Sequence, residues 1–365
     1  MNPRISTLIP TFNRADLLKI TIKSAQMQSF KDIKIIVLDD YSDDNTAMVV
    51  KELASSDKRI DYLVNEENIG FLANHKKIFS LVETDYFSII SDDDCLFPEF
   101  YEQGIKFLDA NKDVDVAIFQ PLFADNMLNL TNPINPLNDR FSILYPNDGF
   151  KAFFDGSINR TWTSMIFRKK CAEIYNEMDP MDFDTGHDMR YLTRVFSRYA
   201  IATTNELGAF HRIYDGGLTN TVISNIMSPI ANVTRDQRLL EVLNDNMVSN
   251  ENKIFAENIL KRSVFGQIKL ALFATAREVY LFLTIYKKDK EKFYEFMNHN
   301  FNMESKALLI FYKLIVSKPI VYILSFLVWI YLPINNYKIK KRDRLLTKSS
   351  NEASKQIDFL KMMHN

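Results

Sequence analysis

The 365-residue chain has few glycines and few cysteines, nine and two respectively. It contains neither G-x-G-x-x-G nor G-x-x-x-x-G-K-[ST], which argues against a Rossmann dinucleotide site and against a P-loop. Cys95 and Cys171 are too few for a disulfide framework and suit a reducing compartment. A formal net charge of −1 gives no global basic field, so we expect no nucleic-acid partner.

The N-terminus also lacks a basic stretch followed by an apolar core, so we expect no secretion signal. The composition is that of a globular protein, with 47% hydrophobic and 25% charged residues. The length allows roughly two domains. We place an α/β catalytic domain at residues 1–230 and a helical region at residues 231–365, because the pattern changes near residue 230.

Apolar strands alternate with helices over the first ninety residues or so. Continuous apolar strands of this kind predict a mostly parallel sheet flanked by helices on both faces. Ligands of such sheets lie beyond the carboxyl ends of the strands. The expected strands are 5–9, 33–38, 60–64 and 86–91, and the expected helices are 14–28 (with Asn13 as N-cap), 45–55 and 73–82.

Three consecutive aspartates, Asp92, Asp93 and Asp94, close the fourth expected strand. Carboxylates this close repel one another unless a cation lies among them. Oxygen ligands suit Mg²⁺ or Mn²⁺, which commonly bridge to a substrate diphosphate. An acidic, solvated turn is the alternative interpretation. Pro10-Thr11 and Asp39-Asp40 end neighbouring strands at the same edge, and this convergence favours a functional site.

The middle of the chain is less regular. We expect a strand at 115–119, a long loop at 121–148, a strand at 161–167 and a polar loop at 182–188. A helix at 189–197, strands at 200–204 and 207–212, and a turn at 215–217 should follow.

The C-terminal region contains an apolar segment, 308–334, directly before a basic cluster at 338–344. Pro319 and Pro333 bound a run that is short for a span of about 20 residues, which favours an interfacial or re-entrant helix. Aromatics and the basic cluster suit an anionic cytoplasmic leaflet, so we expect a peripheral protein on the inner face of the cell membrane. A buried core helix, or pairing of these helices in a homo-oligomer, is the alternative.

In order along the chain, these motifs resemble those of the family 2 glycosyltransferases, which have the GT-A fold. The resemblance covers about residues 4–225. LIPTFNR at 8–14 resembles the family's IPTYNR, and LDDYSDDNT at 38–46 resembles VDDGSTDDT. Asn68-Ile69-Gly70 with Asn74 resembles an NxG…N variant, and residues 91–94 resemble the DxD-type metal motif. Gly186-His187-Asp188 stands where the family usually has Glu-Asp.

The resemblance implies an inverting transfer from a nucleotide-diphosphate sugar, with a UDP-sugar favoured. Asp94 is the expected ligand of a divalent cation, Mn²⁺ or Mg²⁺. Asp39 would accept a hydrogen bond from the base, since a carboxylate suits the imide N–H of uracil. Asp40 would support the loop that begins at Asp39, or would cap the following helix. The implied donor-binding residues are Pro10, Thr11, Phe12, Arg14, Asp39, Asn68, Asp92, Asp93 and Arg212, with Asn74 favoured as a structural residue.

Asp188 is the expected catalytic base, because inverting transfer needs a carboxylate near the acceptor hydroxyl. The helix that follows should favour its charged form. An N-cap role is the alternative for Asp188. His187 would tune Asp188 or contact the acceptor, but an ordinary loop histidine is the favoured interpretation.

Residues 210–217, FHRIYDGG, resemble the family's YRxHxGG stretch that closes over the diphosphate. Aligned on Arg212, the histidine position holds Tyr214, and His211 precedes the arginine, which puts a histidine metal ligand in doubt. Arg212 would bind the diphosphate or form a structural salt bridge.

The expected acceptor is a glycan or a lipid-linked oligosaccharide in bacterial surface polysaccharide assembly, such as lipopolysaccharide or capsule. Two alternatives remain. One is an inactive, membrane-docked scaffold that still binds sugar nucleotides. The other is a sugar nucleotidyltransferase, although the loop 10–14 lacks the glycines usual in that class.

Overall fold

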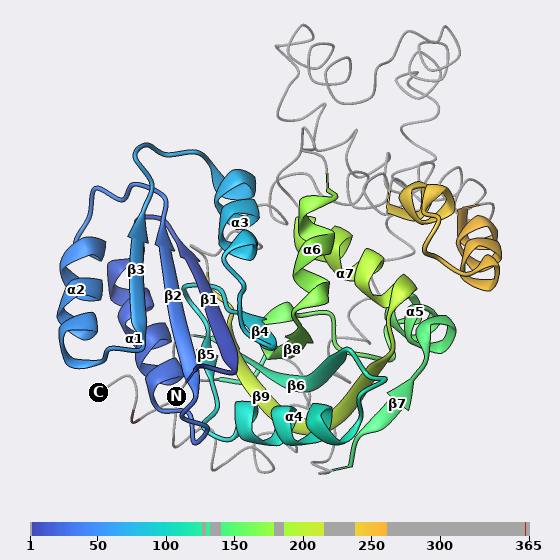
Figure 1. Cartoon of the computed structure of the whole chain (residues 1–365), viewed down its shortest axis with the longest axis horizontal. Coiled ribbons are helices and arrows are strands. Elements are labelled where there is room, and N and C mark those ends of the chain that lie inside the picture. Colours follow the sequence, from blue (N-terminus) through green and yellow to red (C-terminus); the bar gives the residue numbers. More distant parts are fainter. Residues whose placement is uncertain are drawn as a thin grey trace, which may run out of the picture.

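The computed structural model describes residues 2–125, 129–131, 140–178, 186–214, 238–260 and 362. A mixed β-sheet lies between two layers of helices (Figure 1). The strand order is β3-β2-β1-β4-β8-β6-β9-β5, with β7 paired to β9. The expected α/β class, a sheet flanked by helices, is therefore confirmed.

The first half of the sheet is parallel, as predicted. It consists of β1 (Ile5–Thr11), β2 (Ile33–Asp39), β3 (Ile60–Val64) and β4 (Tyr86–Ile89). In the ladder of β1 and β2, Thr11 pairs with Asp39, so the two strands end side by side. The polar residues that follow these strands therefore share one edge of the sheet.

The second half mixes strand directions. It contains β5 (Cys95–Leu96), β6 (Val116–Ala124), β7 (Ser142–Leu144), β8 (Met165–Arg168) and β9 (Ile201–Arg212). The long β6–β9 ladder is parallel, whereas the ladders of β8, β5 and β7 are antiparallel and short. Four-residue strands such as β8 carry too little pattern for direction to be predicted.

Three predictions for this half were wrong. The strands expected at 200–204 and 207–212 are one strand, β9, whose register shifts against β6. The loop expected at 121–148 includes the end of β6, all of β7 and the start of α5 (Pro146–Asp155). The strand expected at 161–167 begins as a 3-10 turn (Trp162–Ser164) before β8.

Alternate residues of the central strands face opposite helix layers. Ile35 and Val37 pack with one layer and Ile36 and Leu38 with the other, as expected for strands buried on both faces. The first layer is α1 (Ala15–Gln26), α2 (Thr46–Ser56) and α4 (Phe100–Ala110). The second is α3 (Phe71–Ser80), α5, α6 (Lys170–Asn176) and α7 (His187–Arg198).

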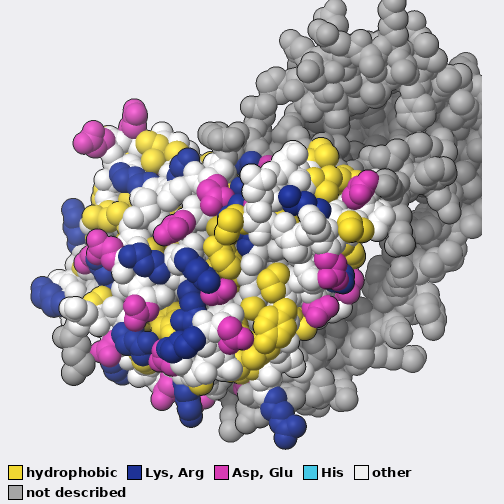
Figure 2. All heavy atoms as spheres, turned by 45° about the vertical axis from the view of Figure 1, so that its right-hand side comes forward, with side chains coloured by type: hydrophobic (Ala, Val, Ile, Leu, Met, Phe, Trp, Pro, Cys, Tyr) yellow, Lys and Arg dark blue, Asp and Glu magenta, His cyan; other side chains and the backbone are white. Residues whose placement is uncertain are grey.

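Two further helices, 238–244 and 250–260, pack against α5 through a cluster that includes Phe150, Leu239, Val242 and Ala256. The apolar segment 308–334 and the basic cluster 338–344 lie outside the described residues, as does the turn at 215–217. Among the residues that the structure describes, no helix has the length and apolar character needed to cross a membrane. Figure 2 shows Lys and Arg interspersed with Asp and Glu over one face of the molecule.

Candidate active site

The aspartate triplet follows β4 and contacts the end of β1. Thr11 Oγ1 donates a hydrogen bond to Asp92 Oδ2 at 2.8 Å. Arg14 Nη1, from the turn before α1, lies 3.2 Å from Asp93 Oδ2. The structure therefore brings Thr11 and Arg14 to the triplet, as the sequence predicts.

Asp94 is the innermost member of the triplet, with 0% of its surface exposed. Its Oδ2 accepts a hydrogen bond from Thr163 Oγ1 at 2.8 Å and lies 3.0 Å from His211 Nδ1. Its Oδ1 accepts from the backbone N–H of Arg212 at 3.0 Å. β9 thus brings His211 directly to Asp94, although alignment with the family motif left that histidine in doubt.

The electrostatics of the triplet favour a bound cation. Burial, followed by repulsion from Asp94 and Asp92, raises the pKa of Asp93 to about 7. Burial raises the pKa of Asp92 to about 6, despite the Thr11 hydrogen bond and the charge of Arg14. Burial would lower the pKa of His211, but the Asp94 carboxylate outweighs it and raises that pKa.

A divalent cation fits these donors only together with a substrate. No group of three or more Asp, Glu, His or Cys side chains within the described ranges is arranged to hold a metal alone. Asp94 and His211 supply one carboxylate and one imidazole, and Mg²⁺ or Mn²⁺ often takes its other ligands from water and phosphate. The residues present therefore fit an ion completed by a diphosphate.

Arg212 and Tyr214 extend β9 over the same loop. Arg212 is 6% exposed, and its Nε donates a hydrogen bond to the Asp93 carbonyl at 3.0 Å. The Tyr214 hydroxyl donates to Asp93 Oδ2 at 3.1 Å and accepts a hydrogen bond from Arg14. These contacts hold the position of Asp93, which the family resemblance implies to be a donor-binding residue.

Asp39 ends β2 and is fixed by two neighbours. Its Oδ1 accepts from the N–H and Oγ of Ser42, at 3.0 and 2.6 Å, and its Oδ2 accepts from the Tyr62 hydroxyl at 2.6 Å. Asp39 is 1% exposed. Ser42 and Tyr62 therefore fix the orientation of the Asp39 carboxylate.

Asp40 supports a loop and does not cap the following helix, α2. Its carboxylate accepts hydrogen bonds from Asn65 Nδ2, Ile69 N and Gly70 N at 2.8–2.9 Å. Of the two roles that the sequence left open for Asp40, the cap is wrong, and the loop that its side chain supports is 65–70 rather than its own. The loop also carries Asn68, whose Oδ1 accepts from Gly70 N at 3.0 Å.

The expected N-cap of α1 was wrong. Asn13 has a left-handed φ of 54°, and its Oδ1 accepts from the N–H of Asp43 at 2.9 Å. Asp44 Oδ2, reaching across from the loop after β2, accepts from Ala15 N–H at 3.0 Å instead.

Other predicted donor residues differ in accessibility. Phe12 is 45% exposed, which leaves its ring open to a ligand, whereas Pro10 is buried within β1. Asn74 is buried, accepts from Asn65 Nδ2 at 2.9 Å and donates to the Leu38 carbonyl at 3.2 Å. Asn74 is thus structural, as favoured, although it acts as a bridge rather than as a cap.

Asp188 lies in the first turn of α7, which begins at His187, two residues earlier than predicted. Gly186 is the N-cap residue, so the N-cap alternative for Asp188 was wrong. Burial raises the pKa of Asp188, opposed by the Met189 N–H and by the charges of Arg238, His211 and His75. The expected preference for the charged form is therefore present but weaker than burial.

Aromatic rings surround the start of α7. His187 packs edge-on against Phe71, His75 and Trp162, at centroid distances of 4.5, 4.8 and 5.0 Å. His187 is therefore a packed residue and not an ordinary loop histidine. Sequence reasoning missed four residues at or beside the site, which no local motif marks: Asn65, His75, Thr163 and Arg238.

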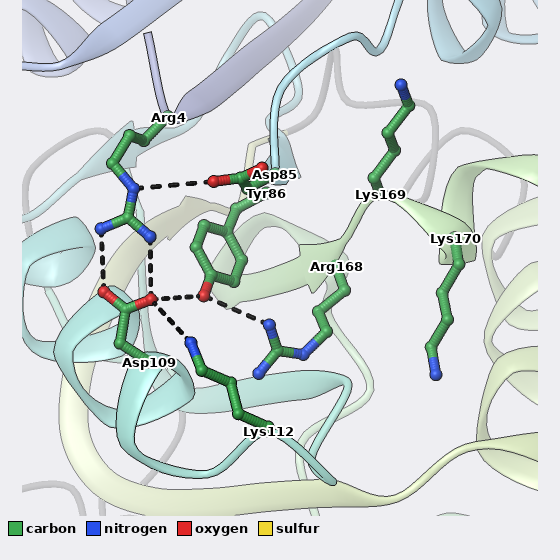
Figure 3. A pocket seen from close by; sticks show the side chains of 8 residues that line it. All are labelled: Arg4, Asp85, Tyr86, Asp109, Lys112, Arg168, Lys169 and Lys170. Atoms are coloured by element: carbon green, nitrogen blue, oxygen red, sulfur yellow. Dashed lines mark hydrogen bonds and ion pairs between the residues drawn. The ribbon is translucent and has the colours of Figure 1, made fainter.

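A separate pocket of about 430 Å³ lies at the opposite edge of the sheet, beside the starts of β1 and β4 (Figure 3). Arg4 forms a bidentate pair with Asp109 at 2.8 Å, and Arg168 donates to the Leu108 carbonyl at 2.6 Å near the end of α4. These contacts join β1, β8 and α4. They lie at the N-terminal ends of β1 and β4, whereas the triplet follows the C-terminal end of β4.

Comparison with known proteins agrees with this geometry. The model of glycosyl transferase family 2 matches residues 6–174. An uncharacterized glycosyltransferase of Methanocaldococcus jannaschii is 30% identical over 141 residues, covering 38% of this chain and 49% of that protein. The GalNAc(5)-diNAcBac-PP-undecaprenol beta-1,3-glucosyltransferase of Campylobacter jejuni is 41% identical over 93 residues, 25% and 30% of the two chains. The chain thus spans half or less of the length of these relatives.

Two solved structures resemble most of the chain in fold. TarS of S. aureus in complex with UDP-GlcNAc has a TM-score of 0.57 at 16% identity, over 74% of this chain and 73% of that one. The mannosyltransferase PcManGT from Pyrobaculum calidifontis, in complex with GDP-Man and Mn²⁺, has a TM-score of 0.50 at 14% identity, over 89% and 84%. The fold is therefore GT-A-like.

The match of residues 6–174 to the model of glycosyl transferase family 2 confirms the resemblance seen in the sequence. This match contains the whole triplet, together with Thr11, Arg14 and Asp39. It ends before Asp188 and His211.

Proposed function

We propose that the protein is an inverting glycosyltransferase that moves a sugar from a UDP-sugar to a hydroxyl of a glycan or lipid-linked oligosaccharide. The observation that carries the proposal is the convergence of two kinds of carboxylate. Buried Asp94 touches His211, and His211 interacts electrostatically with Asp188 at the start of α7. A metal-and-diphosphate site and a proton acceptor would thus be neighbours.

The donor would lie across the carboxyl ends of β1, β2 and β4. Fixed Asp39 would accept the base imide N–H, and the exposed ring of Phe12 would contact the base. Asp94, with His211 as a second ligand, would hold a divalent cation, Mn²⁺ or Mg²⁺. That cation would offset the charge of the leaving diphosphate.

Asp188 would accept the proton of the acceptor hydroxyl as this oxygen attacks the sugar carbon. Burial raises the pKa of Asp188 toward working pH, which strengthens it as a base. The Met189 N–H, 2.7 Å from Oδ1, holds one carboxylate oxygen in place.

The relatives support the substrate classes. The C. jejuni enzyme is named for an acceptor joined to undecaprenol through a diphosphate, and TarS was solved with UDP-GlcNAc. For this chain, a lipid-linked acceptor also suits the apolar segment 308–334 and the basic cluster 338–344, which would bring the site to the cytoplasmic face of the membrane. Sedimentation of the full chain with anionic but not neutral vesicles would be expected.

The test is a thermal-shift screen of UDP, GDP, CDP and dTDP with and without Mn²⁺, combined with UDP-sugar hydrolysis. Binding to the folded state alone raises the melting temperature. Asp94→Asn should abolish the Mn²⁺-dependent shift. Asp188→Asn should keep that shift and slow hydrolysis by about 10²–10⁴-fold. Asp43→Asn, an exposed neighbour of the site, is the control.

No shift with any nucleotide would refute the donor site. A normal shift without hydrolysis in the wild type would instead indicate an inactive nucleotide-binding scaffold. Hydrolysis that is unaffected by Asp188→Asn would refute Asp188 as the base.

A further inference from the structure

Three arginines spaced four residues apart on α7 dock the helix 238–244 and the residue after it. Arg190 and Arg194 bind Glu241, with Nη2–Oε1 and Nε–Oε2 distances of 2.6 and 3.1 Å. Arg198 binds Asp245, with an Nη2–Oδ2 distance of 2.6 Å. Residues later in α7 pair with residues later in the second segment, so helix 238–244 runs parallel to α7.

Arg238 stands three residues before Glu241, about one turn toward the start of α7. A Cβ built on Gly186, the N-cap residue of α7, would lie 3.9 Å from Arg238 Nη1. Arg238 is 9% exposed. Its guanidinium is therefore packed beside the first turn of α7, where Asp188 lies.

At the N-terminal end of α7, the two helices exchange the signs of their charges. Along the rest of α7 the cation belongs to α7, whereas here the cation comes from helix 238–244 and the anion, Asp188, from α7. A lone cation at a helix N-terminus is unfavourable, because the helix dipole is positive there. A carboxylate in the first turn offsets both charges.

Each element around Asp188 contributes a polar or charged group. Arg238 from helix 238–244, His211 from β9, His75 from α3 and the Met189 N–H all favour the charged carboxylate, against burial. Of these side chains, Arg238 is the one that carries a charge over the whole pH range of an assay.

We propose that Arg238 is a positioning residue for Asp188, which orients and electrostatically stabilises its carboxylate, so that helix 238–244 completes the active site. The proposal rests on the proposed function, in which Asp188 is the base. Arg238 lies outside the family match at residues 6–174, so it belongs to the part of the chain that the family model does not define.

The experiment compares full-length Arg238→Met, Arg238→Lys and Arg198→Met with the wild type. Arg198→Met is the matched control, because it breaks an ion pair of the same docking interface at the far end of α7. The rate of UDP-GlcNAc hydrolysis is measured against pH, and the Kd of UDP with Mn²⁺ by calorimetry. The pKa of Asp188 is measured by carboxyl ¹³C NMR, with Asp188→Asn assigning the signal.

In Arg238→Met, the acid limb of the rate profile and the NMR pKa of Asp188 should both move upward by about one unit. The Kd of UDP should stay within about twofold of wild type, because the donor site is unchanged. Arg238→Lys should return both pKa values most of the way to those of the wild type, and Arg198→Met should show no shift.

An unshifted Asp188 in Arg238→Met, or an equal shift in Arg198→Met, would overturn the proposal. If Arg238→Met does not fold, Arg238→Gln takes its place. If both unfold while Arg198→Met folds, Arg238 has a structural role and the proposal is wrong. Because the NMR titration needs no turnover, it separates this failure from failure of the proposed function, which would appear as absent UDP binding or hydrolysis in the wild type.

Discussion

Replacing Asp40 by asparagine removes a charge from a carboxylate that joins the end of β2 to the loop before α3. Asp40 is 3% exposed. Its Oδ1 accepts hydrogen bonds from Asn65 Nδ2 and Ile69 N at 2.8 and 2.9 Å, and its Oδ2 accepts from Gly70 N at 2.9 Å. An amide has one oxygen, so an asparagine here can satisfy only one of the two sides.

The cost follows from these contacts. If the amide oxygen keeps the two donors of Oδ1, the new NH₂ group faces the N–H of Gly70. One hydrogen bond to a charged acceptor is then lost, worth about 1.5–3 kcal/mol, although Asn68 Oδ1 still accepts from Gly70 N. The new NH₂ group is left as a buried, unsatisfied donor, at about 1–3 kcal/mol. Because these terms overlap, we expect Asp40→Asn to lower the free energy of unfolding by about 3 kcal/mol.

Urea unfolding followed by far-ultraviolet circular dichroism measures this loss as a lower midpoint at unchanged slope. Asp43→Asn, with an exposed side chain four residues beyond the end of β2, should change the free energy by less than about 0.5 kcal/mol. Asp40→Asn should also weaken UDP binding, because the loop carries Asn68. A loss below about 1 kcal/mol, or one equal to the control, would refute the reasoning.

Three further predictions concern groups near the site. Burial, followed by the charge of His187, lowers the pKa of His75 to about 3. Below about pH 6.5, the unfolded chain therefore binds a proton at this histidine that the native chain does not bind. His75→Phe should therefore remove an acid destabilisation of about 2 kcal/mol between pH 7 and pH 5. If the melting temperatures at pH 7 and pH 5 differ as much in His75→Phe as in the wild type, this prediction is contradicted. Gly208→Ala should cost about 1–3 kcal/mol in urea unfolding, because its Cβ would lie 2.6 Å from the Cβ of Phe119; equal midpoints would disprove the clash. Since the pKa of Asp93 is raised to about 7, its stabilisation is lost as pH rises through 7, so Asp93→Asn or added Mn²⁺ should flatten the fall in melting temperature from pH 5 to pH 8; a slope equal to that of the metal-free wild type would contradict this.

The parallel half of the sheet was predictable because its signals are local. Apolar runs fix β1, β2, β3 and β4, and the topology of parallel strands places their polar ends at one edge. Thr11, Arg14 and the triplet therefore meet where the sequence indicates.

The rest of the candidate site depends on contacts that no local pattern encodes. His211 lies 117 residues from Asp94 along the chain, and the register shift of β9 against β6 hides which of its side chains reaches the triplet. Likewise, the N-terminal capping of α1 comes from Asp44, across the loop, rather than from the adjacent Asn13. Alignment by motif could not resolve either, because each is set by tertiary packing.

The same limit applies to the arginine-rich face of α7. Arginines at four-residue spacing are typical of a charged outer face, yet Arg190 is 7% exposed because Glu241 covers it. This docking attaches the helix that begins with Asp188 to residues beyond the family match. Most of the proposed donor site therefore lies within the family match. The proposed base, the helix docked on α7 and the two β9 residues at the triplet, His211 and Arg212, lie beyond it, between residues 186 and 245. Differences in acceptor between relatives should accordingly concentrate in this second part, where the packing of one helix on another sets the position of the base.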